Sequence, residues 1–137
     1  MSSHISATPF ADPAELVAHY TRRLAFETDC WDVHDTMNRG AADFVLLDVR
    51  GPLLFEAAHV PGAINLPHGK MTERKMAEWP EETLFVVYCA GPHCNGTDKA
   101  ALRLGSLGRK VKVMIGGMTG WADEGFPFEG TGVIKVA

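Results

Sequence analysis

Three apolar runs along the chain predict the main strands of one sheet. They cover residues 44–49, 84–89 and 111–115. The first two runs are nearly continuous in hydrophobic residues, which is typical of strands covered on both faces in a parallel sheet. The third alternates in part, so we expect it nearer an edge. A minor strand is predicted over residues 63–65.

Amphipathic patterns between these runs predict helices that cover the sheet. Apolar residues recur at helical spacing over 97–107, so the second run, this helix and the third run form a right-handed β-α-β unit. A short helix is expected around 72–78. Together these elements predict an α/β fold of three layers, with a central parallel sheet and helices on both faces.

Two further helices are predicted near the N-terminus. The sequence Asp-Pro-Ala-Glu at 12–15 combines a cap acceptor, a proline at the first helical position and an early acidic residue. Apolar residues then follow on one helical face. A second helix is expected over about 31–39, and Gly40 ends it. We expect these helices to form an N-terminal extension that caps the domain.

Length and composition indicate one folded domain. The 137 residues suffice for a single core, and contents of 46% hydrophobic and 22% charged residues are those of a globular chain rather than a disordered one. The expected boundaries are 1–40 for the helical cap, 41–130 for the α/β domain and 131–137 for a C-terminal tail, all within one compact unit.

The charge and the cysteines narrow the possible partners. A formal net charge of -4 leaves no basic surface, which argues against nucleic acid and anionic membranes. The longest apolar run is too short to span a membrane, and the N-terminus lacks the positive and apolar regions of a signal peptide, so a cytoplasmic location is expected. Three cysteines are an odd number and are expected to be thiols in a reducing compartment. Of these, Cys30 in the predicted N-terminal helices is expected to be structural.

No metal and no other cofactor is expected. The segment 91–97 lacks the lysine that follows the second glycine of a nucleotide-binding loop. The remaining histidines show no spacing typical of a metal site; they are His4, His19, His34 and His68.

Cys89 is the candidate nucleophile, because it ends the second apolar run. Open parallel sheets bind ligands beyond the carboxyl ends of their strands. The glycine-rich segment after Cys89 leads directly into a helix, so its N–H groups are expected to form an anion cradle that lowers the pKa of the thiol. From position alone, an inert buried thiol is the alternative. The predicted cradle residues are Ala90, Gly91, Pro92, His93, Asn95, Gly96 and Thr97.

Three parts of the chain resemble the signatures of the rhodanese family, in the family's order. They are LLDVR (46–50) with FEAAHVPGAINLP (55–67), VVYC (86–89), and IGGMTGW (115–121) with GFP (125–127). The resemblance covers roughly residues 43–129. It implies a rhodanese-like fold and a sulfurtransferase, in which Cys89 takes a sulfane sulfur from thiosulfate or a persulfide, holds it as a persulfide and passes it to a thiol or protein acceptor.

The loop after Cys89 departs from the pattern of that family, which places an arginine before the helix. No arginine lies between Cys89 and Thr97, and the loop is longer than the common form. His93 could supply a partial cation and Lys99 a full one, whereas Asp98 would oppose an anion. The donor therefore need not be thiosulfate.

Other residues are predicted to act beside Cys89. Cys94 could relay sulfur or resolve an oxidised Cys89 through a disulfide, and the alternative is an incidental loop thiol. Asp48 and Arg50 are expected to form a supporting ion pair, and His59 is expected to be a hydrogen-bonded framework residue. Lys99 is the remaining supporting residue.

Two other classes of function stay open. One is an oxyanion enzyme of the phosphatase or arsenate-reductase type, which rhodanese-like folds with enlarged loops resemble. The missing arginine counts against it, because arginine supplies bidentate phosphate recognition. The other is a regulatory or protein-binding domain that keeps the fold without turnover.

Overall fold

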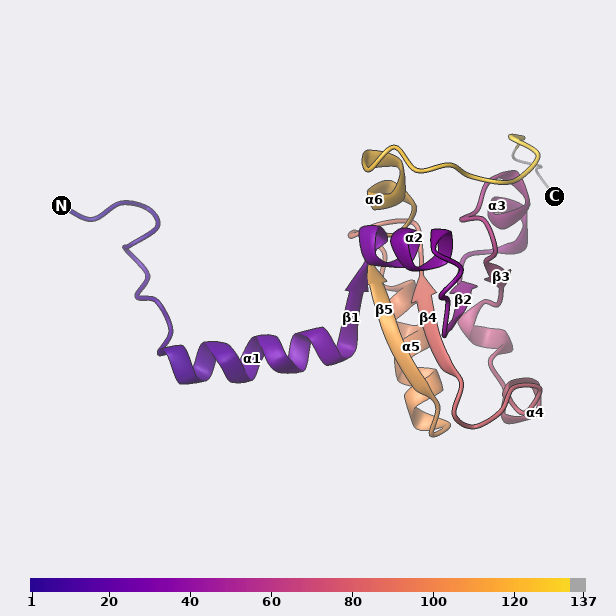
Figure 1. Ribbon diagram of the computed structural model, residues 1–137, viewed down its shortest axis with the longest axis horizontal. Helices are drawn as coiled ribbons and strands as arrows, with labels where there is room; N and C mark the ends of the chain where they lie inside the picture. The colour runs from indigo at the N-terminus through magenta and orange to yellow at the C-terminus, as the bar shows by residue number, and fades with distance from the viewer. Residues whose placement is uncertain (134–137) are drawn as a thin grey trace.

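The computed structural model describes residues 1–133 and is built around a five-stranded parallel sheet. The strand order is β1-β5-β4-β2-β3, so β4 lies at the centre (Figure 1). All pairings between these strands are parallel. The strands are β1 (Glu27–Asp29), β2 (Val45–Asp48), β3 (Ile64–Asn65), β4 (Leu84–Tyr88) and β5 (Lys110–Ile115).

Helices lie on both faces of this sheet, which confirms the predicted α/β architecture. The β4–α5–β5 unit forms as expected, because β4 and β5 are adjacent and parallel. The apolar pattern did not predict the short 3-10 turn η1 (His68–Lys70) or the helix α3 (Pro52–Ala57). The helices are α1 (Pro13–Phe26), α2 (Cys30–Asn38), α3 (Pro52–Ala57), α4 (Glu73–Met76), α5 (Gly96–Ser106) and α6 (Gly117–Asp123).

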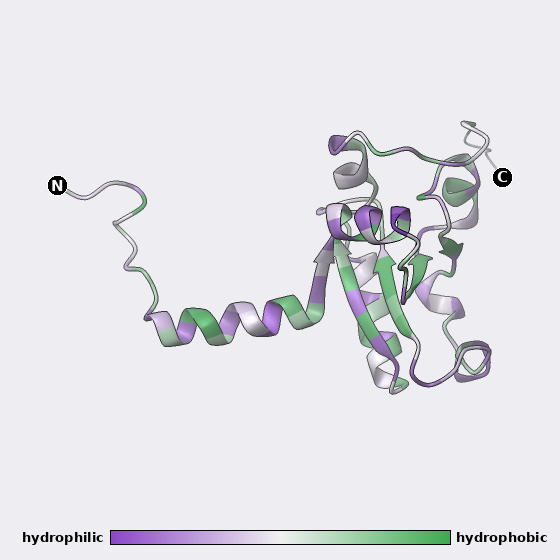
Figure 2. Cartoon of the chain, in the orientation of Figure 1, coloured by the Kyte–Doolittle hydropathy of each residue, from purple (hydrophilic) through white to green (hydrophobic). Residues whose placement is uncertain are grey.

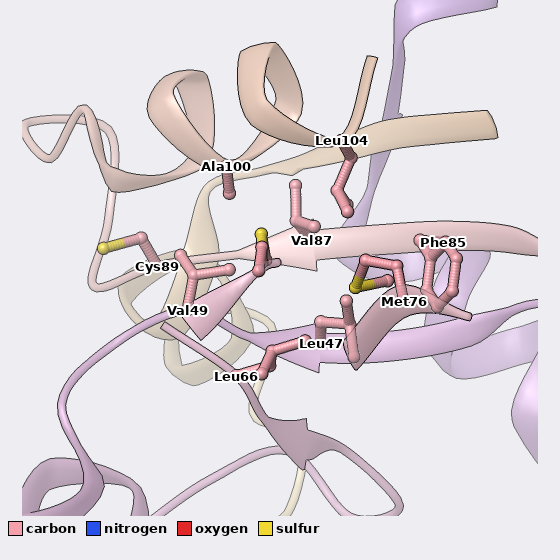
Figure 3. Packing of buried hydrophobic residues seen from close by; sticks show 10 residues of the cluster. Leu47, Val49, Leu66, Met76, Phe85, Val87, Cys89, Ala100 and Leu104 are labelled. Carbon is pink, nitrogen blue, oxygen red and sulfur yellow. The ribbon is translucent and has the colours of Figure 1, made fainter. Parts of the chain in front are cut away.

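Two apolar clusters fill the spaces between the sheet and its helices, because neighbouring residues of a strand point to opposite faces. Phe85 and Val87 of β4 pack with α4 and α5. Val86 and Tyr88 pack with α2 and α6 on the other face. Figure 3 shows the first cluster, with Cys89 at one end of it. Burial on both faces is why the second apolar run is nearly continuous.

The N-terminal region does not form the predicted cap. Helix α1 has the predicted start, since Asp12 accepts a hydrogen bond from Ala14 N at 3.2 Å, but it has no buried residue. It projects away from the sheet (Figure 1), and green segments along it mark apolar residues (Figure 2). Leu24 is one of the exposed apolar residues of this helix. Its amphipathic pattern therefore predicted the helix correctly but not its packing.

The segment after α1 belongs to the sheet and the core. Strand β1 pairs with β5, so the third apolar run lies one strand in from the edge. The polar sequence Glu-Thr-Asp of β1 carries no apolar signal, which is why this edge strand was not predicted. Cys30 and Val33 of α2 are buried in the second cluster. Residues 27–38 are thus part of the α/β unit rather than a cap on it.

The first residues of the predicted C-terminal tail are hydrogen-bonded to α3 of the α/β domain. Thr131 N and Gly132 N donate to the carbonyls of Glu56 and Ala57, at 3.0 and 2.8 Å. Residues 134–137 of the predicted tail lie outside the described residues. Among residues 1–133, no helix has the length and apolar character to cross a membrane.

Candidate functional site

Cys89 lies directly after the central strand β4, where α6 holds the backbone of its loop. Its side chain is buried, with 6% of the residue exposed. Met118 N donates to Cys89 O, and Thr119 N donates to Ala90 O, each at 3.0 Å. Gly117, with a φ of +56°, lets α6 begin against this backbone, because a Cβ there would collide with the Cys89 carbonyl oxygen. The start of the loop is therefore held in one position.

A tight turn brings Cys94 back toward Cys89. Cys94 N donates to Gly91 O at 3.0 Å, and Pro92 occupies the second position of this four-residue turn. Proline favours that position because its ring presets the φ that the turn requires. The local sequence Gly-Pro-His-Cys thus places the second thiol next to the first.

Gly96 provides the space in which the two sulfur atoms meet. A Cβ atom on residue 96 would lie 2.8 Å from Cys89 Sγ and 3.4 Å from Cys94 Sγ. Both sulfurs therefore lie against the first residue of α5. The two thiols also share a hydrogen bond. The pairing of Cys89 with Cys94 is the central feature of the site.

The pKa of Cys89 is raised to about 11, contrary to the lowered value expected from its position at a helix N-terminus. Burial is the largest cause, and the hydrogen bond with Cys94 is the next, while the backbone of Ala90 acts in the opposite direction. The pKa of Cys94 is lowered, chiefly by the hydrogen bond from Cys89 and then by the Gly96 backbone. The first proton therefore leaves Cys94, and the thiol of Cys89 donates to the resulting thiolate.

The predicted anion cradle is present only in part. The backbone amides of Ala90 and Gly96 stabilise the charged sulfur of Cys94, and the positive charge of Lys99 acts in the same direction. Thr97 is buried in the first turn of α5. Of the other predicted cradle residues, Gly91 is buried, whereas Pro92, His93 and Asn95 are exposed.

A cavity of about 500 Å³ opens beside the two cysteines. It is lined by the cysteine loop, by the carboxyl end of β5 and, from α1, by Arg23. Arg23 Nε lies 2.7 Å from Glu27 Oε2, which also lines the cavity. Sequence analysis missed this arginine because Arg23 lies in the N-terminal helix, far along the chain from the Cys89 loop. The spacing of Arg23 in α1 and Glu27, which directly follows the helix, was the available signal.

A larger cavity of about 780 Å³ lies at the other end of β4 and β5 and contains neither cysteine. Arg109 lines it, and its guanidinium donates to the carbonyls of Met76, Trp79 and Pro80. These bonds hold the segment after α4 in place. The smaller cavity, which both cysteines line, is therefore the candidate site, and Arg109 has a structural role.

Asp48 and Arg50 form a buried ion pair behind the loop. Arg50 Nη2 lies 2.8 Å from Asp48 Oδ2, and the two side chains are 9% and 0% exposed. The same nitrogen donates to Ala58 O at 2.6 Å. The guanidinium is thus directed to Asp48 and the backbone, while the negative charge of Asp48 contributes to the raised pKa of Cys89.

His59 lies apart from the cysteine cavity. Its Nδ1 is 2.7 Å from Phe55 O, and its ring stacks on Phe55 with centroids 3.8 Å apart. Its backbone forms an antiparallel bridge with Glu129. These contacts link α3 to the C-terminal segment. His59 does not line the cavity that holds Cys89.

Comparison with known proteins agrees with this geometry. The family model for the rhodanese-like domain matches residues 32–124. The chain belongs to the rhodanese-like domain family. This confirms the resemblance seen in the sequence, and the match begins within α2, before the expected boundary at residue 41.

Relatives of this rhodanese-like chain include a regulator and an enzyme. It is 35% identical over 91 residues to the HTH-type transcriptional regulator Rv0324 of Mycobacterium tuberculosis, a match covering 66% of this chain and 40% of that protein. It is 31% identical over 108 residues to the adenylyltransferase and sulfurtransferase UBA4 of Meyerozyma guilliermondii, covering 70% of this chain and 25% of that protein. The chain thus spans less than half the length of these relatives.

This rhodanese-like chain also resembles a solved structure of similar length. The BH2092 protein of Bacillus halodurans is 36% identical, with a TM-score of 0.85 and coverage of 88% of both chains. The superposition thus covers more of this chain than residues 32–124, which the family model matches.

Proposed function

We propose that this rhodanese-like protein carries a sulfane sulfur as a persulfide on Cys89 and passes it to a thiol on a small molecule or a protein. The observation that carries the proposal is the position of Cys89 after the central strand, against Gly96 and beside a cavity. A relative whose name includes sulfurtransferase activity supports the same chemistry. The family includes enzymes of this kind, and we assign this chain to them.

The charges around the cysteines favour a persulfide over thiosulfate as the donor. Thiosulfate is a dianion, and the buried Asp48 and the Cys94 thiolate place negative charge near Cys89. No arginine lies in the loop after Cys89 to offset them. Arg50 is paired with Asp48, and Arg23 in the cavity wall is paired with Glu27. A low-molecular-weight persulfide carries less charge and therefore meets less repulsion.

The transfer of sulfur to Cys89 requires its proton to leave. Cys94 is hydrogen-bonded to Cys89 and holds the negative charge of the pair, so it is positioned to accept that proton. Cys89 then attacks the outer sulfur of the donor R–S–SH, its bond to that sulfur forms, and the donor S–S bond breaks. The products are the Cys89 persulfide and the donor thiolate, which takes up the proton from Cys94 and leaves as a thiol.

Intact-mass analysis tests the proposal. We would incubate wild type, Cys89→Ser, Cys94→Ser and Cys30→Ser with thiosulfate or with a low-molecular-weight persulfide, and then add cyanide. Cys94→Ser is expected to gain the mass of a sulfur atom and to lose it to cyanide. If Cys89→Ser gains sulfur and Cys94→Ser does not, Cys94 rather than Cys89 carries the sulfur. If no variant gains sulfur from either donor, the proposed function is wrong.

A sensing domain is the second candidate, because a relative with 35% identity is a transcriptional regulator. Such a domain would load sulfur or become oxidised once, without repeated turnover of donor. Continuous thiocyanate formation in the presence of cyanide would favour the enzyme, and a single stoichiometric loading would favour the sensor. Hydrolysis of an aryl phosphate would instead favour the oxyanion-enzyme alternative.

A further inference from the structure

We propose that Cys94 resolves the Cys89 persulfide, so that the loop releases the bound sulfur as hydrosulfide and closes into a Cys89–Cys94 disulfide. This inference rests on the proposed function, because it begins from sulfur already bound to Cys89. It assigns a second activity to the same loop, the reduction of a sulfane sulfur to sulfide.

The geometry brings the two sulfur atoms to the same place beside Gly96. Both lie within 3.4 Å of the same point beside Gly96, and the turn closed by Cys94 N and Gly91 O holds them there. The two side chains already share a hydrogen bond. This placement puts Cys94 Sγ on the same side of the loop as Cys89 Sγ, as an attack of one sulfur on the other requires.

The loop also determines which thiol attacks. Cys94 is half-exposed, and its thiolate is stabilised by the amide of Gly96 and by the charge of Lys99. Cys89 is buried at the end of β4 and holds the sulfur to be removed. The inner sulfur of the persulfide is Cys89 Sγ itself, which is the atom that Cys94 contacts. The outer sulfur extends from it and is the leaving group.

The step balances without an external oxidant. The Cys94 thiolate attacks Cys89 Sγ, the bond between the two cysteine sulfurs forms, and the bond to the outer sulfur breaks. The outer sulfur leaves as HS⁻ with the electron pair of that bond, so the sulfane sulfur is reduced while the two cysteines are oxidised to a disulfide. One negative charge is present before and after the step.

A low-molecular-weight thiol completes the cycle. Its thiolate attacks the half-exposed Cys94 Sγ, which frees Cys89 and leaves a mixed disulfide on Cys94. A second molecule of the thiol then releases Cys94. The overall reaction consumes one persulfide and two thiols, and it yields sulfide, the donor thiol and an oxidised disulfide of the reductant.

The third cysteine provides a matched control. Cys30 is buried in the second cluster, on the face of the sheet covered by α2 and α6. Its Sγ contacts Ile115 O at 3.5 Å and Gly117 O at 3.6 Å. Cys30 does not line the cavity beside Cys89 and Cys94, so Cys30→Ser is expected to behave as wild type.

A single-turnover experiment tests the inference. Reduced wild type, Cys94→Ser and Cys30→Ser would each receive one equivalent of a low-molecular-weight persulfide, without added reductant. Sulfide would be trapped with a bimane reagent while intact mass and peptide maps follow the protein. We expect wild type and Cys30→Ser to release nearly one equivalent of sulfide and to lose two hydrogens, with Cys89 linked to Cys94. Cys94→Ser should keep the sulfur and release almost no sulfide.

The outcomes separate this inference from the proposed function. If Cys94→Ser gains sulfur but wild type also retains it without sulfide or disulfide, the resolving role is wrong and the carrier role stands. If the sulfur is found on Cys94 of wild type, Cys94 is a relay and the inference is overturned. If Cys94→Ser gains no sulfur on Cys89, the proposed function itself fails.

Discussion

Gly96 and Cys89 are in direct contact, although they come from different elements of the β-α-β unit. A Cβ atom on residue 96 would lie only 2.8 Å from Cys89 Sγ, closer than side-chain carbon atoms approach sulfur in folded proteins. Because residue 96 has no side chain, the sulfur of Cys89 can occupy the space beside it. Any group added at this position must displace the thiol.

Replacement of Gly96 by alanine is expected to slow sulfur loading of Cys89. Moving a packed side chain costs about 1–2 kcal/mol, which corresponds to roughly a tenfold lower rate. Loading would be followed by intact mass with a persulfide donor. Gly105→Ala is the matched control, because a Cβ there meets nothing within 4 Å in the same helix α5. Equal loading of both variants would contradict the role assigned to Gly96.

The hydrogen bond from Cys89 is expected to control the pH dependence of Cys94 alkylation. This bond is the largest cause of the lowered pKa of Cys94. Only the thiolate reacts with iodoacetamide, so a lowered pKa makes Cys94 reactive at lower pH. In Cys89→Ala the donor is lost, the pKa of Cys94 rises, and the midpoint of the rate profile moves to higher pH. At neutral pH the rate falls.

Peptide mass spectrometry at a series of pH values would measure this profile for Cys94. Cys30→Ala is the control, because Cys30 is not a cause of the shift in Cys94. A midpoint that stays in place or moves to lower pH in Cys89→Ala would show that the pair does not share its proton as described.

The buried ion pair of Asp48 and Arg50 is expected to be important for stability. Arg50→Met leaves the carboxylate of Asp48, which is 0% exposed, without its partner. An uncompensated buried charge costs about 3–5 kcal/mol of the free energy of unfolding. Urea denaturation measures this loss. Arg39→Met breaks an exposed pair with Asp35 and is expected to cost less than about 1 kcal/mol. Similar losses for both variants would contradict the prediction.

Alkaline pH is expected to destabilise the protein through Cys30. Burial raises the pKa of this thiol from 9.0 to about 11. Between these values the folded state keeps the proton that the unfolded state has lost, so the free energy of unfolding falls as pH rises. The slope from this group is roughly 1.4 kcal/mol per pH unit. Urea denaturation at several pH values should show a shallower decline for Cys30→Ala than for wild type. Parallel declines would contradict this assignment.

The layered fold could be predicted because its signals are local or periodic. The apolar runs that became β2, β4 and β5 and the helical spacing in α5 each reflect burial that the residues themselves require. Strand β1 could not be predicted, because its polar residues are held by pairing with β5 rather than by burial. The position of α1 could not be predicted either, since an amphipathic pattern shows that a face is apolar but not which surface covers it.

By itself, the sequence determined the family, the three-layer fold and the location of Cys89 after a buried strand. The turn over residues 91–94 was not predicted, although the proline at its second position was a local signal for it. Only the tertiary structure decided how the proton is shared between Cys89 and Cys94 and brought Arg23 of α1 to the same cavity. The physical reason is that pKa values and cavity walls depend on burial and on distances between segments, and neither is encoded in the spacing of residues along the chain.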